Sequence, residues 1–226
     1  MKRGKLRSII KKVLVGMILV FSMVTTSFTA SVYAKTDVPY KLQESSIVYK
    51  VNSKRVMLDM AHSDSPLDKG CSYGEYNERD IANKITLKVK QLLEAEGIEV
   101  TLTRNEGETI SIAERIKLAN SADYNYYISI HINSSGTENQ GTGVEAWSSN
   151  AWSLSRKVLK ELENEFNYKY RGIYASEFYN RKIDDKSTIL EIGFLNNEYD
   201  RNNLVNHQDR YASAIARGII AQLKEE

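Results

Sequence analysis

Strand-length patterns alternate with amphipathic helix patterns along this chain, and this order restricts its fold more than any other feature. The strand patterns fall at residues 56–60, 99–104, 126–132, 143–147 and 188–192. Helical periodicity occupies residues 78–97, 111–120, 153–166 and 209–223. Strands that alternate with helices of this length predict a single α/β domain with a mainly parallel, twisted sheet covered by helices on both faces.

Two helix starts carry specific signals. The helix that begins at Glu78 should end before Gly97, because glycine suits the position just past a helix C-terminus. Its apolar stripe comprises Ile81, Ile85, Val89, Leu92 and Leu93. Ser111 and Glu114 have the spacing of a capping box, in which each side chain bonds the other residue's backbone N–H, so a second helix should begin there.

The first 34 residues have the layout of a secretory signal peptide. Six basic residues precede the 12-residue apolar run VLVGMILVFSMV, and the small-residue site Val32-Tyr33-Ala34 follows it. A spanning helix needs roughly 20 apolar residues, so cleavage of residues 1–34 is favoured over an uncleaved membrane anchor. Residues 35–54 are interpreted as a spacer or edge element, and residues 55–226 as one folded domain.

The charge of the chain outside this segment argues against nucleic-acid binding. The first 34 residues hold six of the 31 basic residues and none of the 29 acidic ones, so the remainder carries a formal charge of −4. A nucleic-acid-binding protein would need a concentrated basic face. Cys71 is the only cysteine, so no internal disulfide can form, and we expect a free thiol in a polar loop rather than a nucleophile.

Three residues that can do chemistry should meet at one edge of the sheet. His62 lies two residues past the first strand, His131 at the end of the central strand and Glu191 at the end of the last. Ligands of open α/β sheets bind outside the carboxyl ends of the strands. Glu191 also ends a buried strand, where a carboxylate without a partner is unfavourable. His207, before the closing helix, is expected to be a solvated cap or turn residue.

Two histidines and a carboxylate form the ligand set of catalytic zinc sites, which leave one position open for water. Glu78 can turn back toward the loop of His62, because it begins the helix that follows this loop. The competing acidic residues near this loop are Glu75, Asp59 and Asp64. The ordinary interpretation is that both histidines are hydrogen-bonded core or rim residues and that Glu78 complements the helix dipole.

Six sequence blocks follow one another in an order typical of a known family. They are VMLDMAH, NERDIANKI, LTRN with SIAERIKLAN, YISIHINSS, GVEAWSS and ILEIGFLNN. The most specific pieces are S-I-H-x-N and L-E-x-G-F-L-x-N, and the resemblance that the blocks carry extends over roughly residues 55–224. In this order the chain resembles the zinc-dependent N-acetylmuramoyl-L-alanine amidases of family 3.

The resemblance implies hydrolysis of the amide bond between the lactyl group of N-acetylmuramic acid and the L-alanine of the peptide stem in peptidoglycan. It places the family's Zn²⁺ ligands on His62, Glu78 and His131 and its catalytic glutamate on Glu191. Glu191 would take a proton from water and return it to the leaving nitrogen, and a partly desolvated site would raise its pKa toward the useful range. Export agrees with this activity, because peptidoglycan lies outside the membrane.

The resemblance also bears on neighbouring residues and on physiology. Arg115 and Asn120 fall on the family's arginine and Ala-Asn positions and are interpreted as structural residues that hold a helix against the sheet. Ser129 and Asn133 flank His131 and are expected to orient its imidazole through hydrogen bonds. The chain is similar to short exported amidases that act on spore cortex, and a monomer is favoured.

The turn around His62 departs from the family pattern. The family usually has G-H-G-G, whereas this chain has Ala61-His62-Ser63-Asp64, whose side chains resist backbone angles that glycine permits. Asp64 is therefore a candidate to approach the metal, and an accessory protein that assists zinc loading is a candidate partner. Two alternatives stay open: a non-catalytic or partner-activated peptidoglycan-binding protein of the same fold, and a zinc peptidase that acts on stem peptides.

Overall fold

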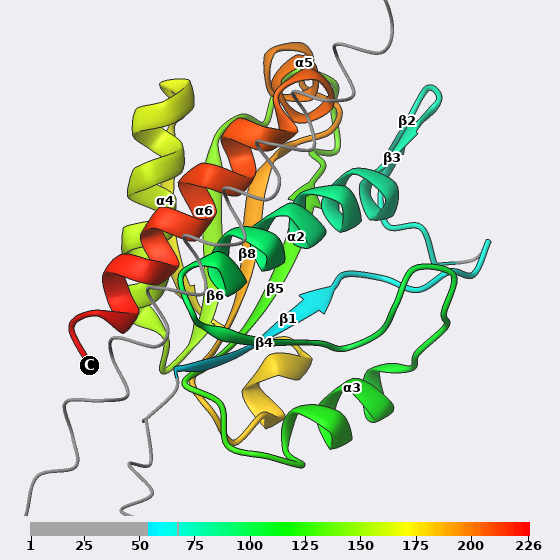
Figure 1. Cartoon of the computed structure of the whole chain (residues 1–226). Coiled ribbons are helices and arrows are strands. Elements are labelled where there is room, and N and C mark those ends of the chain that lie inside the picture. The colour runs from blue at the N-terminus through cyan, green and yellow to red at the C-terminus, as the bar shows by residue number, and fades with distance from the viewer. Residues whose placement is uncertain (1–53, 67) are drawn as a thin grey trace, which may run out of the picture. The chain divides into compact units, whose positions relative to one another are not determined.

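The computed structural model describes residues 54–66 and 68–226, which are built around a six-stranded sheet (Figure 1). The strand order is β4-β1-β5-β8-β6-β7, and the β6–β8 pair is antiparallel while the other neighbours are parallel. The strands are β1 (Arg55–Met60), β4 (Glu99–Leu102), β5 (Tyr126–Asn133), β6 (Val144–Ser149), β7 (Tyr170–Ala175) and β8 (Ser187–Phe194). The prediction of a mainly parallel α/β sheet is confirmed.

Helices cover both faces of this sheet. The large apolar core lies between one face and the helices α2 (Glu78–Ala95), α4 (Trp152–Phe166) and α6 (Gln208–Leu223), which cross the front of the view in Figure 1. The helix α3 (Ile112–Ala119) and the 3-10 helix η1 (Tyr179–Lys182) cover part of the opposite face around a smaller cluster that contains Met57 and Tyr127. The short helix α5 (Glu198–Asn206) joins β8 to α6.

Local sequence signals explain where these helices begin and end. Asn77 caps α2 by accepting a hydrogen bond from the backbone N–H of Asp80, and Gly97 follows the helix with φ of 77°. The expected apolar stripe is buried except for Leu92, which is 39% exposed. Both hydrogen bonds of the predicted capping box at Ser111 are present, so the start of α3 is confirmed.

Some elements were not expected from the sequence. The loop between β1 and α2 contains a small hairpin of β2 (Ser72–Tyr73) and β3 (Tyr76–Asn77), and β7, η1 and α5 were also missed. β7 is an edge strand with mixed exposure, and α5 has few apolar residues, so neither carries a clear hydrophobic period.

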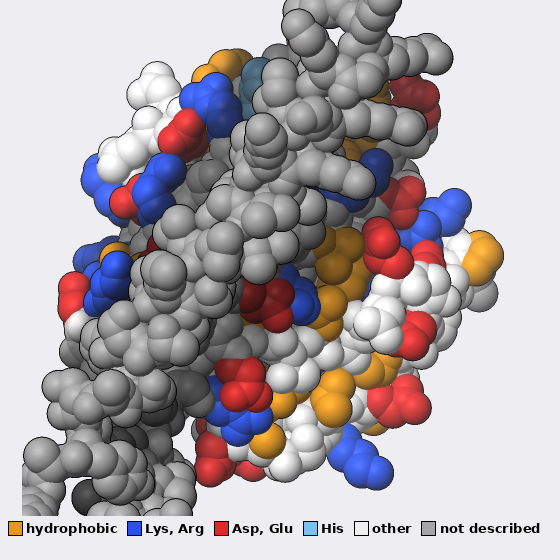
Figure 2. Space-filling view, in the orientation of Figure 1, with side chains coloured by type: hydrophobic (Ala, Val, Ile, Leu, Met, Phe, Trp, Pro, Cys, Tyr) orange, Lys and Arg blue, Asp and Glu red, His pale blue; other side chains and the backbone are white. Residues whose placement is uncertain are grey.

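On the face that carries α2, α4 and α6, the helices are held by close packing and by surface ion pairs. Gly218 of α6 lies against the backbone of Val158 in α4, where a Cβ would come within 2.6 Å of the Val158 Cα. Glycine therefore allows these two helices to approach closely. Figure 2 shows basic and acidic side chains interspersed over the described part of this face, in agreement with pairs such as Arg217–Glu161 at 2.7 Å.

The expected signal segment at 1–34 and the spacer up to residue 53 lie outside the described residues. Within residues 54–66 and 68–226, no helix is long and apolar enough to cross a membrane.

Candidate metal centre

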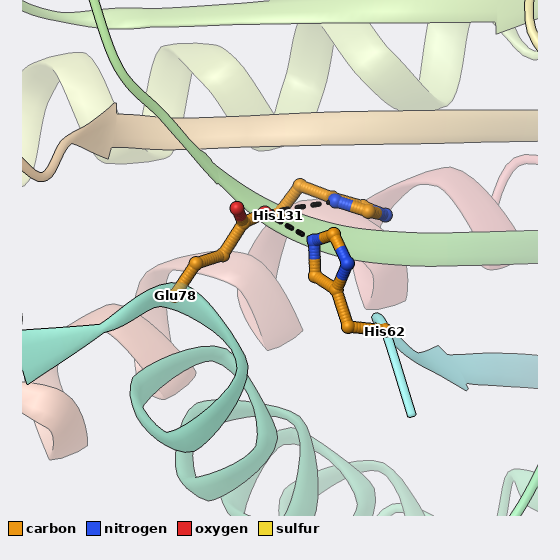
Figure 3. A group of neighbouring side chains, drawn as sticks. All are labelled: His62, Glu78 and His131. Carbon is orange, nitrogen blue, oxygen red and sulfur yellow. Dashed lines mark hydrogen bonds and ion pairs between the residues drawn. The ribbon is translucent and has the colours of Figure 1, made fainter. Parts of the chain in front are cut away.

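His62, Glu78 and His131 converge at the carboxyl ends of β1 and β5 (Figure 3). His62 follows β1, Glu78 is the first residue of α2, and His131 lies near the end of β5. Glu78 Oε1 lies 2.9 Å from His131 Nδ1 and 3.1 Å from His62 Nε2. One ligand atom from each residue lies within 4.8 Å of the others, so the group can hold a metal ion.

The donor set and its spacing fit zinc. Zinc bonds of about 2.0–2.2 Å in a tetrahedral site place neighbouring ligand atoms about 3.3–3.6 Å apart. The observed 2.9 and 3.1 Å separations are close to this range. His62 Nε2 is buried and is not aligned to hydrogen-bond with any described residue, which is unfavourable for a polar atom unless a cation completes its environment.

The electrostatics of Glu78 suit a ligand carboxylate. Burial would raise its pKa, but the hydrogen bond to His131 and the nearby imidazole of His62 outweigh this effect and hold the pKa well below its ordinary value. The backbone N–H groups of Cys71 and Ile132 also donate to its two oxygens, at 2.9 and 3.0 Å. Glu78 is therefore ionised and fixed in position at neutral pH.

Asp68 supports His62 from the other side of the ring, a role that sequence reasoning missed. His62 Nδ1 lies 2.8 Å from Asp68 Oδ1, and Ser63 Oγ donates to Asp68 Oδ2 at 2.8 Å. When Nδ1–H donates to the carboxylate, Nε2 keeps its lone pair for a metal, an arrangement common among metal-bound histidines. No periodic pattern marks Asp68, because its position depends on the course of an irregular loop.

The turn that breaks the family's glycine pattern adopts the left-handed conformation at His62 itself. The φ angle of His62 is 61°, a value that side-chain-bearing residues adopt only at some cost. Its carbonyl accepts hydrogen bonds from Arg104 Nε at 3.0 Å and from Arg115 Nη2. Two buried guanidinium groups thus hold this backbone. The expectation for Asp64 is wrong, because it pairs with Arg79 at 3.1 Å and not with the histidine cluster.

Asp59 anchors Arg115 beneath the site. Asp59 is fully buried, and its carboxylate accepts hydrogen bonds from the side chains of Arg115, Thr103, Ser129 and Tyr179. Burial would raise its pKa, but the charge of Arg115 and these hydrogen bonds lower it to about 2. Asp59 is therefore committed to this cluster and is not a fourth candidate ligand. The structural interpretation of Arg115 agrees with these contacts.

We expect Arg115→Met to lower the free energy of unfolding by about 3–5 kcal/mol, because it leaves the Asp59 carboxylate buried without its counter-charge. Zinc affinity should also fall, since the His62 carbonyl loses one donor. Urea unfolding followed by circular dichroism measures the first effect. The double variant Asp59→Asn/Arg115→Met should be more stable than Arg115→Met alone. A total loss of stability equal to the sum of the losses in the two single variants would contradict this coupling.

Glu191 lies beside the cluster on the neighbouring strand. The sheet register pairs His131 of β5 with Glu191 of β8, and Glu191 with Glu145 of β6. Glu191 Oε2 is buried and has no hydrogen-bond partner among the described residues. Burial raises the pKa of Glu191 to about 7; the charge of His131 opposes this, while the negative charges of Glu78 and Glu145 add to it. A carboxyl group in this state can both accept and donate a proton near neutral pH.

Glu145 of β6, which pairs with Glu191 across the strands, is a buried carboxylate that sequence reasoning did not single out. It accepts hydrogen bonds from Asn133 Nδ2 at 2.9 Å and from Arg171 Nε at 2.6 Å. The expectation that Asn133 and Ser129 orient the His131 imidazole is wrong, because Asn133 donates to Glu145 and Ser129 donates to Asp59. The alternation of side chains in β5 places Ser129 and Asn133 on the same face as His131, but it does not determine their hydrogen-bond partners.

The remaining sequence candidates lie away from the cluster or have other roles. Glu75 is exposed in the turn between β2 and β3. His207 caps the junction of α5 and α6, as expected. Asn120 ends α3 and donates to the carbonyl of Lys182 at 3.1 Å, which ties α3 to η1. Cys71 is a free, partly buried thiol whose pKa is raised by burial, so it is a poor nucleophile.

A pocket of about 520 Å³ adjoins the histidines on the β1 side of the site. Its lining includes several charged and hydroxyl side chains, and it lies between the His62 loop, the start of α3 and η1. Arg115 and Tyr179 form part of its wall. This pocket gives the cluster an open approach for a substrate.

Gly70 provides space that the cluster needs. A Cβ at this position would overlap Glu78 Oε2 and lie within 2.5 Å of His62 Nε2. We therefore expect Gly70→Ala to displace two candidate ligands and to lower zinc affinity at least about tenfold, as measured by competition with a chelating dye.

A matched control separates this contact from backbone strain. Gly70 has φ of 68° and Gly74 has φ of 59°, but a Cβ at Gly74 meets nothing within 4 Å. Gly74→Ala should lower stability by about 1–2 kcal/mol and leave zinc affinity unchanged. Equal losses of zinc affinity in both variants would contradict a specific role for Gly70.

Fold and site together define an α/β protein that presents a His-Glu-His group, able to hold a metal ion, at the carboxyl ends of parallel strands. A family model described as N-acetylmuramoyl-L-alanine amidase matches residues 56–221, and the chain belongs to this family. The enzyme class and the peptidoglycan bond that were expected from the resemblance are thereby confirmed.

Individual relatives agree with this assignment. The germination-specific N-acetylmuramoyl-L-alanine amidase of Bacillus subtilis (strain 168) is 23% identical over 202 residues, which cover 78% of this chain and 82% of that protein. The amidase AmiC2 of Nostoc punctiforme has a TM-score of 0.71 at 27% identity, with 76% of this chain and 97% of that chain covered. The CwlD amidase of Clostridioides difficile, solved in complex with the GerS lipoprotein, shares the fold at a TM-score of 0.71 and 24% identity, covering 77% of this chain and all of that chain.

Proposed function

We propose that this chain is a zinc-dependent N-acetylmuramoyl-L-alanine amidase in which His62, Glu78 and His131 hold Zn²⁺ and Glu191 transfers protons. The observation that carries the proposal is the convergence of three ligand atoms within 4.8 Å beside Glu191, whose buried Oε2 has no hydrogen-bond partner among the described residues. Bound there, zinc would polarise the lactyl carbonyl and lower the pKa of a water molecule toward about 7.

Other steps of the proposed reaction, ligand positioning and proton transfer, are assigned to individual side chains. Glu78 stays ionised because the two imidazoles lie beside it, and Asp68 holds the His62 ring with Nε2 directed at the cluster. In this proposal Glu191 takes a proton from water and returns it to the alanine nitrogen, which leaves poorly unless protonated. Its raised pKa supports both steps, since the group exchanges its proton near neutral pH.

The test is identification of the products from purified peptidoglycan. Mass spectrometry should find peptide stems with new free L-alanine amino termini and intact N-acetylmuramic acid carrying a free lactyl carboxylate. A chelator should abolish these products, and added zinc should restore them. Cleavage within the stem instead would identify a zinc peptidase, and binding of peptidoglycan without any product would favour the non-catalytic alternative.

The accessory-protein hypothesis makes a separate prediction about zinc loading. The structural neighbour CwlD was solved in complex with the GerS lipoprotein, so the zinc content of this chain should be measured with and without proteins of the producing cell. Here the two arginines on the His62 carbonyl support a preformed turn, so we expect the isolated protein to bind about one zinc per chain. A zinc content that rises only when proteins of the producing cell are present would favour assisted loading.

We also propose that the enzyme acts in the cell wall after export, with residues 1–34 removed and residues 55–226 as the catalytic domain. The named relatives include germination-specific and sporulation-specific amidases, which supports a role in spore cortex. Amino-terminal sequencing of the protein recovered outside the membrane tests cleavage. An amino terminus at Met1 in that fraction would contradict it.

A further inference from the structure

Three touching aromatic rings form a partly exposed cluster near Glu191. They are Trp147 on β6, Tyr174 on β7 and Phe178 just before η1. The ring centroid of Trp147 lies 5.0 Å from that of Tyr174 and 5.2 Å from that of Phe178. Tyr174 is 40% exposed and Phe178 is 48% exposed. Aromatic surface gathered in this way and left in water is typical of a binding surface.

The sheet register places this cluster directly beside the proton-transfer group. Residues paired across neighbouring strands point to the same face, and so do residues two positions apart along a strand. One row across the sheet consists of His131, Glu191, Glu145 and Gly172. The next row on the same face consists of Ser129, Ile189, Trp147 and Tyr174. Successive rows lie about 7 Å apart, so the cluster continues the surface of the site.

The orientation of the Tyr174 ring brings the aromatic cluster closer to the row that contains Glu191. Its hydroxyl donates to the Arg171 carbonyl at 3.0 Å, and a Cβ on Gly172 would lie 3.1 Å from that hydroxyl. The ring thus lies back along β7 toward the row that contains Glu191. Between them, Glu145 is paired with Arg171, so no free charge separates the rings from the site.

The two sides of the site differ in chemistry. The strand order places β1 on one side of the β5–β8 pair and β6 with β7 on the other. The pocket on the β1 side contains charged and hydroxyl side chains, among them Asp68, Ser111 and Arg115. The β6–β7 side offers uncharged aromatic faces. A substrate whose two ends differ, sugar on one side of the cleaved bond and peptide on the other, matches this division.

We propose that the Trp147–Tyr174–Phe178 cluster is a glycan subsite, which stacks a sugar ring of the peptidoglycan strand next to the N-acetylmuramic acid whose amide is cleaved. This inference rests on the proposed amidase function. The C–H face of a pyranose ring carries slight positive charge and packs against the negative face of an aromatic ring. The stem peptide carries ionised groups, which are stabilised in the polar pocket and not on uncharged rings.

A binding experiment tests the subsite without any need for catalysis. Trp147 and Trp152 are the only tryptophans, so Trp152→Phe leaves Trp147 as the sole indole reporter. Titration of this protein with peptide-free glycan oligomers should change the fluorescence saturably. Adding Tyr174→Ala and Phe178→Ala to this protein should raise the Kd for the glycan about tenfold. No fluorescence change with glycan, or a saturable change only with free stem peptide, would overturn the proposal.

Kinetics provide the second readout. The wild type should prefer a muropeptide with several sugars over one with a single N-acetylmuramic acid, and Tyr174→Ala/Phe178→Ala should reduce this ratio of kcat/KM about tenfold. Trp152→Ala is the matched control, because Trp152 is 42% exposed but lies on α4, outside the cluster. An equal loss on both substrates would overturn the subsite. A wild type that cleaves neither substrate would contradict the amidase function, whereas the titration would still report on the glycan.

Discussion

Glu191→Gln is expected to lower kcat by about 10²–10⁴-fold while the protein stays folded and keeps its zinc. The amide has the shape of the carboxyl group but cannot take a proton from water or return one to the alanine nitrogen, and general acid-base catalysis is typically worth this factor. Single-turnover release of free L-alanine amino termini from muropeptides measures the loss.

The control for this substitution is Glu75→Gln, an equal change at an exposed position between β2 and β3. It should retain wild-type kcat. Zinc content and thermal unfolding of both variants exclude indirect effects. If Glu191→Gln formed product at the wild-type rate, Glu191 would not be the proton-transfer group, and the search for one would move to the neighbouring Glu145.

His131→Ala is expected to abolish activity through loss of the metal. It removes one of the three proposed ligand atoms and leaves the Glu78 carboxylate without its 2.9 Å partner. Loss of a direct ligand should weaken zinc binding by more than the 10–100-fold typical of an outer partner. Elemental analysis after dialysis against a weak chelator measures zinc per chain.

The sheet should survive this substitution, because His131 lies near the end of β5 while the residues before it are buried in the core. Circular dichroism should therefore match that of the wild type. His207→Ala is the matched control, since His207 caps α5 far along the chain from the cluster and should not affect zinc. One zinc per chain retained in His131→Ala would contradict the assigned ligand set.

Much of the site could be predicted because parallel strands bring their carboxyl ends to one edge. His131 and Glu191 each lie near the end of an apolar strand run, and the register pairs them directly. Three acidic residues near the His62 loop compete with Glu78 for the ligand role in the sequence. The structure separates them: Asp59 is committed to Arg115, Asp64 pairs with Arg79, and Glu75 is exposed.

Contacts that depend on irregular backbone could not be predicted. Asp68 reaches His62 through a loop with no periodic pattern, and Arg104 reaches the His62 carbonyl from 42 residues away. The left-handed angle at His62 was unexpected because the sequence shows only the missing glycines, not the guanidinium groups that hold the turn. Glu145 and Trp147 were missed because β6 joins the sheet antiparallel to β8.

The sequence by itself determined the order of strands and helices, the buried faces, the convergence of His62, His131 and Glu191 at one edge, and the family. These properties follow from local periodicity and from the rule that parallel strands end together. Only the tertiary structure decided how His62 is held, which partners keep Asp59 and Asp64 away from the histidines, and which rings lie beside Glu191. Those contacts join residues far apart in the chain, and their geometry is set by strand register and loop course, which no local pattern encodes.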